Sequence, residues 1–214
     1  MHIPDGFIAP QVYLPAYALA AGAWWWSARG LRRRLEAEQV PRLAMLTALA
    51  YALGLVMIPL PGGTSGHALG VALLALLFGV RLCFIAYSMV LVLQSLLFGA
   101  GGITALAINA LTMGLTGSLA ALAAYHGLRR FNESVAVLAA GWLSVVVSAL
   151  LIAVVLGLQP MIGQRADGSP LFFPFGLSIT LPAVLLPHLL IGIGEAALTL
   201  LIWRFARARK WAAA

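Results

Sequence analysis

The sequence predicts an all-α membrane protein, a bundle of about seven transmembrane helices with the N-terminus outside and the C-terminus in the cytoplasm. Two observations lead to this fold class. Apolar residues make up 63% of the 214 residues and charged residues only 9%, a balance that the surface of a soluble domain cannot carry. The Lys and Arg residues also gather between the apolar segments, on alternate ends of them.

Seven apolar segments are candidates for the helices, because a spanning helix needs about 20 mainly apolar residues. They cover residues 10–28, 43–60, 68–80, 82–98, 103–124, 134–157 and 181–203. The third segment is short, so we expect it to be broken or tilted. No polar linker is long enough to separate two domains, and residues 1–214 are expected to form a single integral membrane domain.

Positive charge sets the expected orientation. Twelve of the thirteen Lys and Arg residues follow the first, third, fifth and seventh segments: Arg29, Arg32, Arg33, Arg34, Arg42, Arg81, Arg129, Arg130, Arg204, Arg207, Arg209 and Lys210. Because Lys and Arg favour the cytoplasmic side, the first residues and the loops 61–67, 99–102 and 158–180 are expected outside, with Arg165 the single exception. The chain opens without the early positive charge of a signal peptide, so we expect the N-terminus to be retained.

Composition also excludes several classes of site and partner. A single cysteine, Cys83, excludes a disulfide framework, a Cys-rich zinc module and an iron–sulfur site. A metal site would therefore use His, backbone or carboxylate donors. Nucleic acid is not an expected partner, and the chain has no Gly-Lys-Ser/Thr loop for binding nucleotide phosphates. We expect no organic cofactor.

The first two residues form a possible metal chelate. The α-amine of Met1, the backbone nitrogen of His2 and an imidazole nitrogen of His2 can close two fused rings around one ion. Binding through the amide nitrogen requires loss of its proton, which favours Ni(II) or Cu(II) in a planar field over Mg(II) or Ca(II). By itself, a His at position 2 is also compatible with a solvated terminal residue.

His67 is a candidate for a fourth nitrogen. It ends the glycine-rich stretch PGGTSGH at residues 61–67, in a loop expected on the same outer face. Glycine permits close approach of a loop to another backbone, as folding over an N-terminus requires. Asp5 is a candidate to orient an imidazole or balance charge beside the ligands. The alternative for His67 is an exposed loop residue bonded to water.

A stripe of small residues follows one face of the second segment. Ala44, Ala48 and Ala52 recur at every fourth position, which permits close packing against another helix in lipid. The stripe is compatible either with packing inside the bundle or with docking to a partner membrane subunit.

These motifs together resemble the NikM/CbiM family, the substrate-binding membrane components of energy-coupling-factor ABC transporters for nickel and cobalt. The resemblance rests on MHIPDG at residues 1–6 and GGTSGH at 62–67. It extends to LQSLLFGAGGIT at 93–104 with Asn109, to SPLFFPFG at 169–176 and to LPH at 186–188. It therefore spans nearly the whole chain.

The resemblance implies a non-catalytic subunit that captures one divalent metal, its transported substrate, at the extracytoplasmic face of a prokaryotic plasma membrane. The implied ligands are nitrogens of Met1, His2 and His67. Thr64, Ser65, Asn109 and His188 join Asp5 as candidates to support these ligands. The implied partners are a transmembrane coupling subunit, which would dock on the alanine stripe, cytoplasmic ATPase subunits and, in some members, a small accessory membrane subunit.

Nickel is favoured over cobalt as the substrate. Relatives that read IPDG after the His, with an outer loop like PLFFPF, resemble the nickel branch more than the cobalt branch. A planar field of four nitrogens also suits Ni(II), although Cu(II) would bind such a site at least as well.

Other polar residues within the apolar segments are costly there unless they are paired. His188 and Glu195 lie seven residues apart, on one face of the last segment, and a buried hydrogen-bonded network is the simpler interpretation for them. Gln94 and Asn109 are expected to brace the bundle.

Two alternative functions belong to other classes. The stretch GTSG at residues 63–66, with His188 as a base, matches the pattern of an intramembrane serine protease. Glu195 could instead be the proton site of an ion-coupled secondary transporter, which is typically built from inverted repeats that this sequence does not show.

Overall fold

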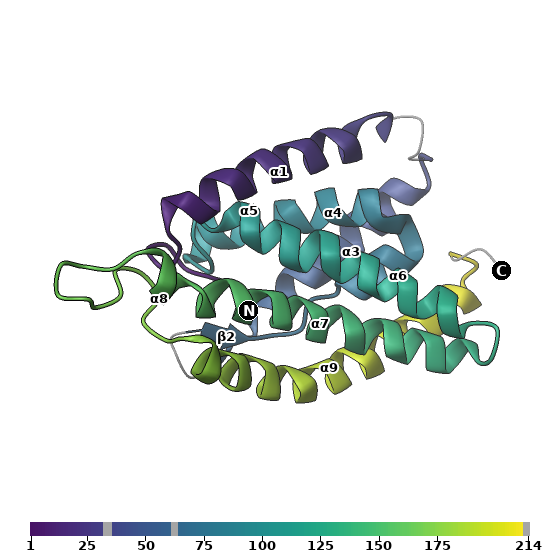
Figure 1. Cartoon of the computed structure of the whole chain (residues 1–214). Coiled ribbons are helices and arrows are strands. Elements are labelled where there is room, and N and C mark those ends of the chain that lie inside the picture. Colours follow the sequence, from purple (N-terminus) through teal and green to yellow (C-terminus); the bar gives the residue numbers. More distant parts are fainter. Residues whose placement is uncertain (32–35, 61–63, 212–214) are drawn as a thin grey trace.

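The computed structural model describes residues 1–31, 36–60 and 64–211, and 73% of these described residues are helical. The helices are α1 (Pro10–Ala28), α3 (Gln39–Leu55), α4 (Val71–Phe98), α5 (Leu106–Asn109), the π-helix η1 (Ala110–Thr116), α6 (Gly117–Leu128), α7 (Glu133–Gly157), α8 (Gln159–Ile162) and α9 (Leu177–Ala208). Strands β1 (Ile58–Leu60) and β2 (Thr64–Gly66) pair antiparallel. Figure 1 shows the N-terminus within the bundle, close to β2.

Four helical stretches in the described ranges are long and apolar enough to cross a membrane: Val71–Phe98, Leu106–Leu128, Glu133–Ile162 and Leu177–Ala208. Leu106–Leu128 runs through α5, η1 and α6 without interruption. The all-helical membrane class predicted from composition is therefore supported. The number of seven spanning helices and the sides on which the termini lie remain predictions.

The third and fourth predicted segments meet at a break in α4. Gly79 has φ 78° and ψ 170°. This conformation lies outside the helical region, and glycine adopts it readily because it has no Cβ. The Cys83 thiol donates to the Val71 carbonyl oxygen over 3.4 Å, although a straight helix would separate residues twelve apart by about 18 Å. The chain therefore folds back at Gly79, and residues 71–78 form a short helix, as the short third segment predicted.

The second predicted segment is wrong at its C-terminal end. The sequence predicted a helix over residues 43–60, whereas α3 ends at Leu55 and residues 58–60 form β1. Pro59 explains the difference, because the residue before a proline is disfavoured in helical conformation and proline has no N–H for the helix ladder. Pro59 instead lies opposite Ser65 in the hairpin.

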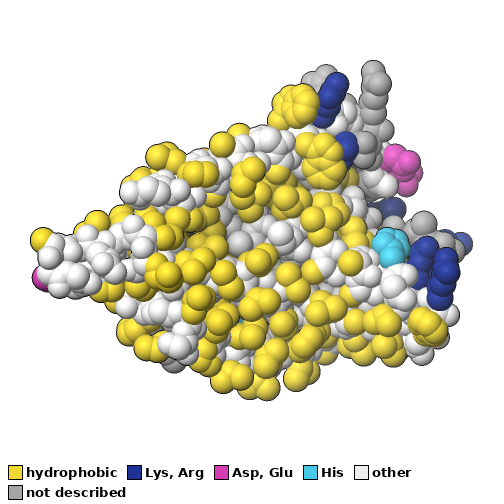
Figure 2. Space-filling view, viewed as in Figure 1, with side chains coloured by type: hydrophobic (Ala, Val, Ile, Leu, Met, Phe, Trp, Pro, Cys, Tyr) yellow, Lys and Arg dark blue, Asp and Glu magenta, His cyan; other side chains and the backbone are white. Residues whose placement is uncertain are grey.

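The outer surface agrees with a membrane environment. Large apolar side chains are exposed on several helices, for example Leu19, Leu190 and Leu201, each about 70% exposed. In Figure 2 apolar side chains cover most of the visible face, and Lys and Arg gather at the end where the C-terminus lies. For the described residues, collection of the positive charge at one end is what the alternation in the sequence predicted; Arg32, Arg33 and Arg34 lie outside the described residues.

Helices α7 and α9 pack at very close range. A Cβ added to Gly141 of α7 would lie 2.7 Å from the Cα of Ala196 on α9, closer than real Cβ contacts come. The two nearest atoms it would meet belong to the α9 backbone, which cannot turn aside as a side chain can. This helix crossing therefore depends on a glycine at position 141, which has no side chain, as is common where membrane helices meet through small residues.

We predict that Gly141→Ala lowers the stability of the protein by about 1–3 kcal/mol, the usual cost of overpacking a close contact. Thermal unfolding of the purified protein in detergent measures this loss. Gly194→Ala is the matched control, because an added Cβ there meets no atom of the described residues within 4 Å. Equal melting temperatures for the two variants would show that the crossing tolerates a methyl group.

Candidate metal site

The first residues of the chain lie inside the bundle. Met1 and Ile3 are fully buried, and His2 is 4% exposed. Asn109, at the end of α5, holds this segment by both of its amide atoms. Its Oδ1 accepts from the Ile3 N–H over 3.2 Å, and its Nδ2 donates to the Ile3 carbonyl over 3.2 Å.

Asp5 anchors the same segment a few residues further along. Its carboxylate accepts from the backbone N–H groups of Ile103 and Thr104 over 3.1 and 2.8 Å, and also from the Thr104 hydroxyl. The Thr104 hydroxyl is the largest of the effects that lower the pKa of the Asp5 carboxyl. Gly102 permits this approach, since a Cβ there would lie 2.3 Å from the Asp5 nitrogen. Asp5 thus fixes the path of the chain through bonds that do not involve the histidines.

The hairpin β1–β2 brings the second part of the site to the N-terminus. The Met1 amine donates to the Ser65 carbonyl oxygen on β2. The contribution of Ser65 therefore comes through its backbone, whereas the sequence prediction concerned the residue as a whole. Thr64 also lies on β2, and its side chain falls outside the described residues.

His67 follows directly after β2 and is 2% exposed. Its Nδ1 donates to the Ala68 carbonyl oxygen over 2.9 Å, because a carbonyl can only accept. Its Nε2 is then the unprotonated ring nitrogen of the neutral imidazole, and it has no hydrogen-bond partner among the described residues. A buried nitrogen with a free lone pair is the form in which histidine binds a metal.

The rings of His2 and His67 stack on each other. Their centroids are 4.4 Å apart and their planes meet at 18°. Neither ring nitrogen of His2 has a hydrogen-bond partner in the part of the chain that the structure describes. The backbone at Gly101 borders this ring, since a Cβ there would lie 3.4 Å from the His2 side chain. Buried ring nitrogens of two histidines, without partners in the described ranges, are therefore gathered in one place.

Burial keeps these nitrogens neutral. It lowers the pKa of the Met1 amine to about 4 and the pKa of His2 to about 3. It also holds the pKa of His67 well below its usual value, and the Met1 amine adds to this effect. Amine and imidazole nitrogens bind metal only when deprotonated, so the lowered pKa values favour metal over protons.

His188, on α9, borders the loop that carries His67. It is fully buried, and its Nδ1 donates to the Val184 carbonyl oxygen over 2.7 Å. Its Nε2 finds no partner within residues 1–31, 36–60 and 64–211, and a Cβ added to Gly66 would lie 3.7 Å from it. His188 therefore reaches the residue before His67, as its candidate supporting role requires.

Gln94, on α4, is the residue that sequence reasoning underestimated, because it was assigned only to bracing. It is fully buried, and its Nε2 donates to the Tyr51 carbonyl oxygen over 3.2 Å. The Gln94 side chain also raises the pKa of His2, although burial lowers that pKa by more. Gln94 is therefore a neighbour of the His2 ring. The sequence did contain a signal for such a role, because the side-chain amide of a glutamine is costly within an apolar helix unless it is paired.

The arrangement differs from a site built from side chains alone. Within the part of the chain that the structure describes, no three His, Cys, Asp or Glu side chains are grouped closely enough to hold a metal. The predicted ligand set needs only two such side chains, His2 and His67, and takes its other donors from the amino terminus and the backbone.

The predicted docking stripe lies on the surface. Ala44, Ala48 and Ala52 are all exposed, whereas Leu46 and Ala50 on the same helix are buried. The stripe therefore faces away from the core of this chain, which disfavours packing inside the bundle, the first of the two interpretations that the sequence left open.

Comparison with known proteins finds relatives that are named as metal transport proteins. A family model described as the cobalt uptake substrate-specific transmembrane region, CbiM, matches residues 2–213. The fused nickel transport protein NikMN of Rhodobacter capsulatus is 35% identical over 206 residues, which cover 93% of this chain and 59% of the relative. The cobalt transport protein CbiM of Thermosynechococcus vestitus is 31% identical over 219 residues, covering 96% of this chain and 79% of the relative.

The fold has a close match among solved structures. The crystal structure of a truncated transition metal transporter superposes with a TM-score of 0.94 at 32% identity, covering 98% of this chain and 99% of that one. The chain spans about three fifths of the length of the fused relative, 59%. With the family model matching almost every residue, the chain belongs to the CbiM/NikM family of nickel and cobalt transport proteins.

Proposed function

We propose that the chain is the substrate-specific membrane subunit of an energy-coupling-factor transporter. In this proposal it captures a divalent transition metal ion, nickel rather than cobalt, at the extracytoplasmic face of a prokaryotic plasma membrane. The observation that carries the proposal is the buried Met1 amine beside the stacked imidazoles of His2 and His67. Three of the four ring nitrogens of these imidazoles have no hydrogen-bond partner among the described residues. Membership of a metal transport family supports it.

The proposed ligands are four nitrogens. The Met1 amine, the His2 amide nitrogen and His2 Nδ1 close a five-membered and a six-membered ring, and His67 Nε2 completes a plane. Lone pairs of imidazole lie in the ring plane, so the stacked rings must rotate relative to each other to bind the same ion. No hydrogen bond to the described residues holds the nitrogens of the His2 ring against that rotation.

Nickel follows from the chemistry of this donor set. A deprotonated amide and three neutral nitrogens form a strong planar field, which suits Ni(II) better than Co(II). Cu(II) would bind at least as tightly, so its exclusion would depend on metal availability.

The proposed partners supply the energy. Because the chain has no phosphate-binding loop, cytoplasmic ATPase subunits would hydrolyse ATP and a transmembrane coupling subunit would transmit the change. The exposed alanines of α3 are the proposed docking surface for that subunit, since small side chains permit close approach of helices in lipid. A small accessory membrane subunit is a further proposed partner. The end bearing most Lys and Arg would face the cytoplasm.

The two alternative functions gain no support from the contacts. A serine protease would pair Ser65 with His188, whereas His188 Nε2 has no hydrogen-bond partner among the residues that the structure describes. A secondary transporter would use Glu195 as a proton site, but that carboxylate accepts two backbone N–H groups at fixed positions.

Extending the N-terminus by one glycine should abolish tight nickel binding, because the α-amine would leave the chelating position and become an amide. Elemental analysis of the untagged protein after loading with nickel measures the effect. The control is the same glycine added after Ala214, at the other end of the chain. Unchanged nickel content in the N-terminal variant would rule out the chelate.

His67→Ala should weaken nickel binding by about 100-fold or more, since losing one nitrogen donor costs more than losing a supporting residue. Isothermal titration gives the affinity. His126→Ala is the control, because His126 is an exposed histidine at the end of α6. If the two variants bind nickel equally, the loop serves another purpose.

Ala48→Leu combined with Ala52→Leu should disrupt assembly with the coupling subunit while nickel binding stays unchanged, because both positions face outward. Co-purification of the transporter subunits measures assembly. Ala18→Leu combined with Ala21→Leu is the matched control, since it adds the same two side chains at exposed positions of α1. Normal assembly of the α3 variant would exclude the stripe as the docking surface.

A further inference from the structure

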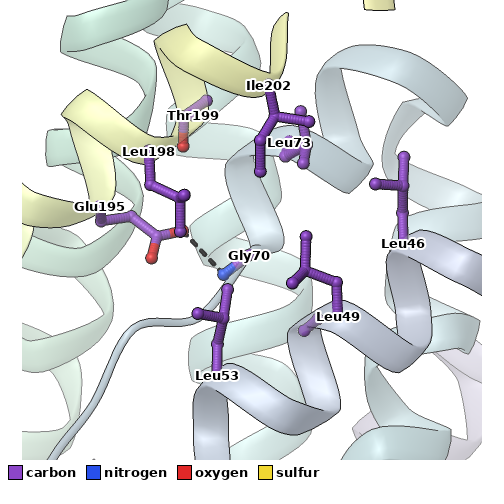
Figure 3. A pocket seen from close by; sticks show the side chains of 10 residues that line it. Leu46, Leu49, Leu53, Gly70, Leu73, Glu195, Leu198, Thr199 and Ile202 are labelled. Atoms are coloured by element: carbon purple, nitrogen blue, oxygen red, sulfur yellow. Dashed lines mark hydrogen bonds between the residues drawn. The ribbon is translucent and has the colours of Figure 1, made fainter. Parts of the chain in front are cut away.

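Glu195 is a buried carboxylate near the middle of α9, and it binds the backbone next to the proposed metal loop. Its side chain accepts from the Leu69 N–H over 2.9 Å and from the Gly70 N–H over 2.7 Å. Figure 3 shows the carboxylate pointing from α9 toward Gly70. Glu195 is 1% exposed, so these two bonds matter: an acidic group inside a membrane bundle is costly unless it is paired.

The two N–H groups lie at and just before the N-cap of the short helix at residues 71–78. Gly70 is its N-cap, with φ 71°. The first N–H groups of a helix have no partner within the helix, and inside an apolar bundle no water replaces it. The carboxylate satisfies one of these donors, the N–H of Gly70, together with the N–H of Leu69 just before it. A negative group is also favoured at a helix N-terminus.

The same backbone determines where His67 points. Leu69 and Gly70 follow His67 by two and three residues. The His67 ring itself donates to the carbonyl of Ala68, which lies between His67 and Leu69. On the other side of His67, a Cβ on Gly66 would lie 2.4 Å from Ile191 Cδ1 of α9. The backbone on both sides of His67 is therefore held against α9, by packing before the histidine and by Glu195 after it.

We propose that Glu195 is a positioning residue that holds the backbone after His67 so that the imidazole nitrogen faces the metal. This inference rests on the proposed function and names a residue through which that site is built. Glutamate suits the role because both of its oxygens accept. Glutamine has one accepting oxygen, and its NH₂ group would face one of the two N–H donors.

A purely structural role is the competing explanation, and the neighbouring residues provide a control for it. Glu195 borders a small cavity of about 10 Å³, and half of its ten lining residues are leucines, including Leu198 one turn further along α9. Figure 3 shows Leu198 in this cavity beside Glu195. Leu198→Ala disturbs the packing of the same region but leaves the hydrogen bonds to residues 69 and 70 in place.

The experiment compares wild type, Glu195→Gln and Leu198→Ala, each as the full chain in detergent with its native amino terminus. Nickel affinity, the visible absorption spectrum of the nickel complex and the melting temperature of the metal-free protein are measured. We expect Glu195→Gln to weaken nickel binding by about 10-fold to 100-fold, as loss of a ligand-supporting residue does, and to shift the absorption band to longer wavelength. Leu198→Ala should lower the melting temperature and keep wild-type affinity and spectrum.

Wild-type affinity and spectrum in Glu195→Gln would overturn the inference while leaving the proposed function intact. Equal losses of affinity in Glu195→Gln and Leu198→Ala would also overturn it, because packing alone would then explain the effect. If Glu195→Gln does not fold, Glu195→Asp carries the same comparison, since it keeps both oxygens but withdraws them by one methylene group. A wild-type protein that binds no nickel would remove the proposed function and the inference together.

Discussion

Burial of the first residues of the chain inside an apolar bundle is the constraint on which the site depends. Every polar backbone group taken there needs a partner, since neither lipid nor the bundle interior supplies water. Asn109 and the Gly102 N–H satisfy Ile3, and the Ser65 carbonyl accepts from the Met1 amine. With the backbone held in this way, the groups left without partners among the described residues include the ring nitrogens that a metal would bind.

Much of this arrangement could be predicted from the sequence, because it depends on local patterns. Hydropathy located the long helices, and the short third segment indicated a broken or tilted helix there. Met1, His2 and His67, which the structure brings together, were predicted as ligands from residue type and position. The helix predicted for residues 58–60 was wrong, because the prediction gave more weight to their apolar content than to Pro59. Gln94 beside His2 and Glu195 beside Leu69 could not be predicted, since these contacts join residues far apart in the chain and depend on how the helices cross.

The two parts of the site are attached to the bundle in different ways. The N-terminal segment is bound by side chains of the α5 and α8 regions and by the chain around Gly102, including a bond from the Ala9 N–H to Gln159. The loop around His67 is bound to α9 through Glu195 and meets α3 where a Cβ on Gly70 would lie 3.0 Å from the Ala50 Cβ. The loop therefore touches the helix that carries the exposed alanines.

This difference bears on how a bound metal would leave. The four proposed nitrogen ligands come from two chain segments, and they would release an ion if one segment moved away from the other, because the proposed chelate of Met1 and His2 is a single unit. A partner that shifts α3 would act on Gly70, which contacts Ala50 on the inner face of that helix. The N–H groups of Gly70 and Leu69 both donate to the Glu195 carboxylate, and Leu69 lies two residues after His67. In this proposal, a mechanical connection from the proposed docking face to the proposed site would run through the His67 loop, and the N-terminal chelate would remain anchored while the fourth ligand withdraws.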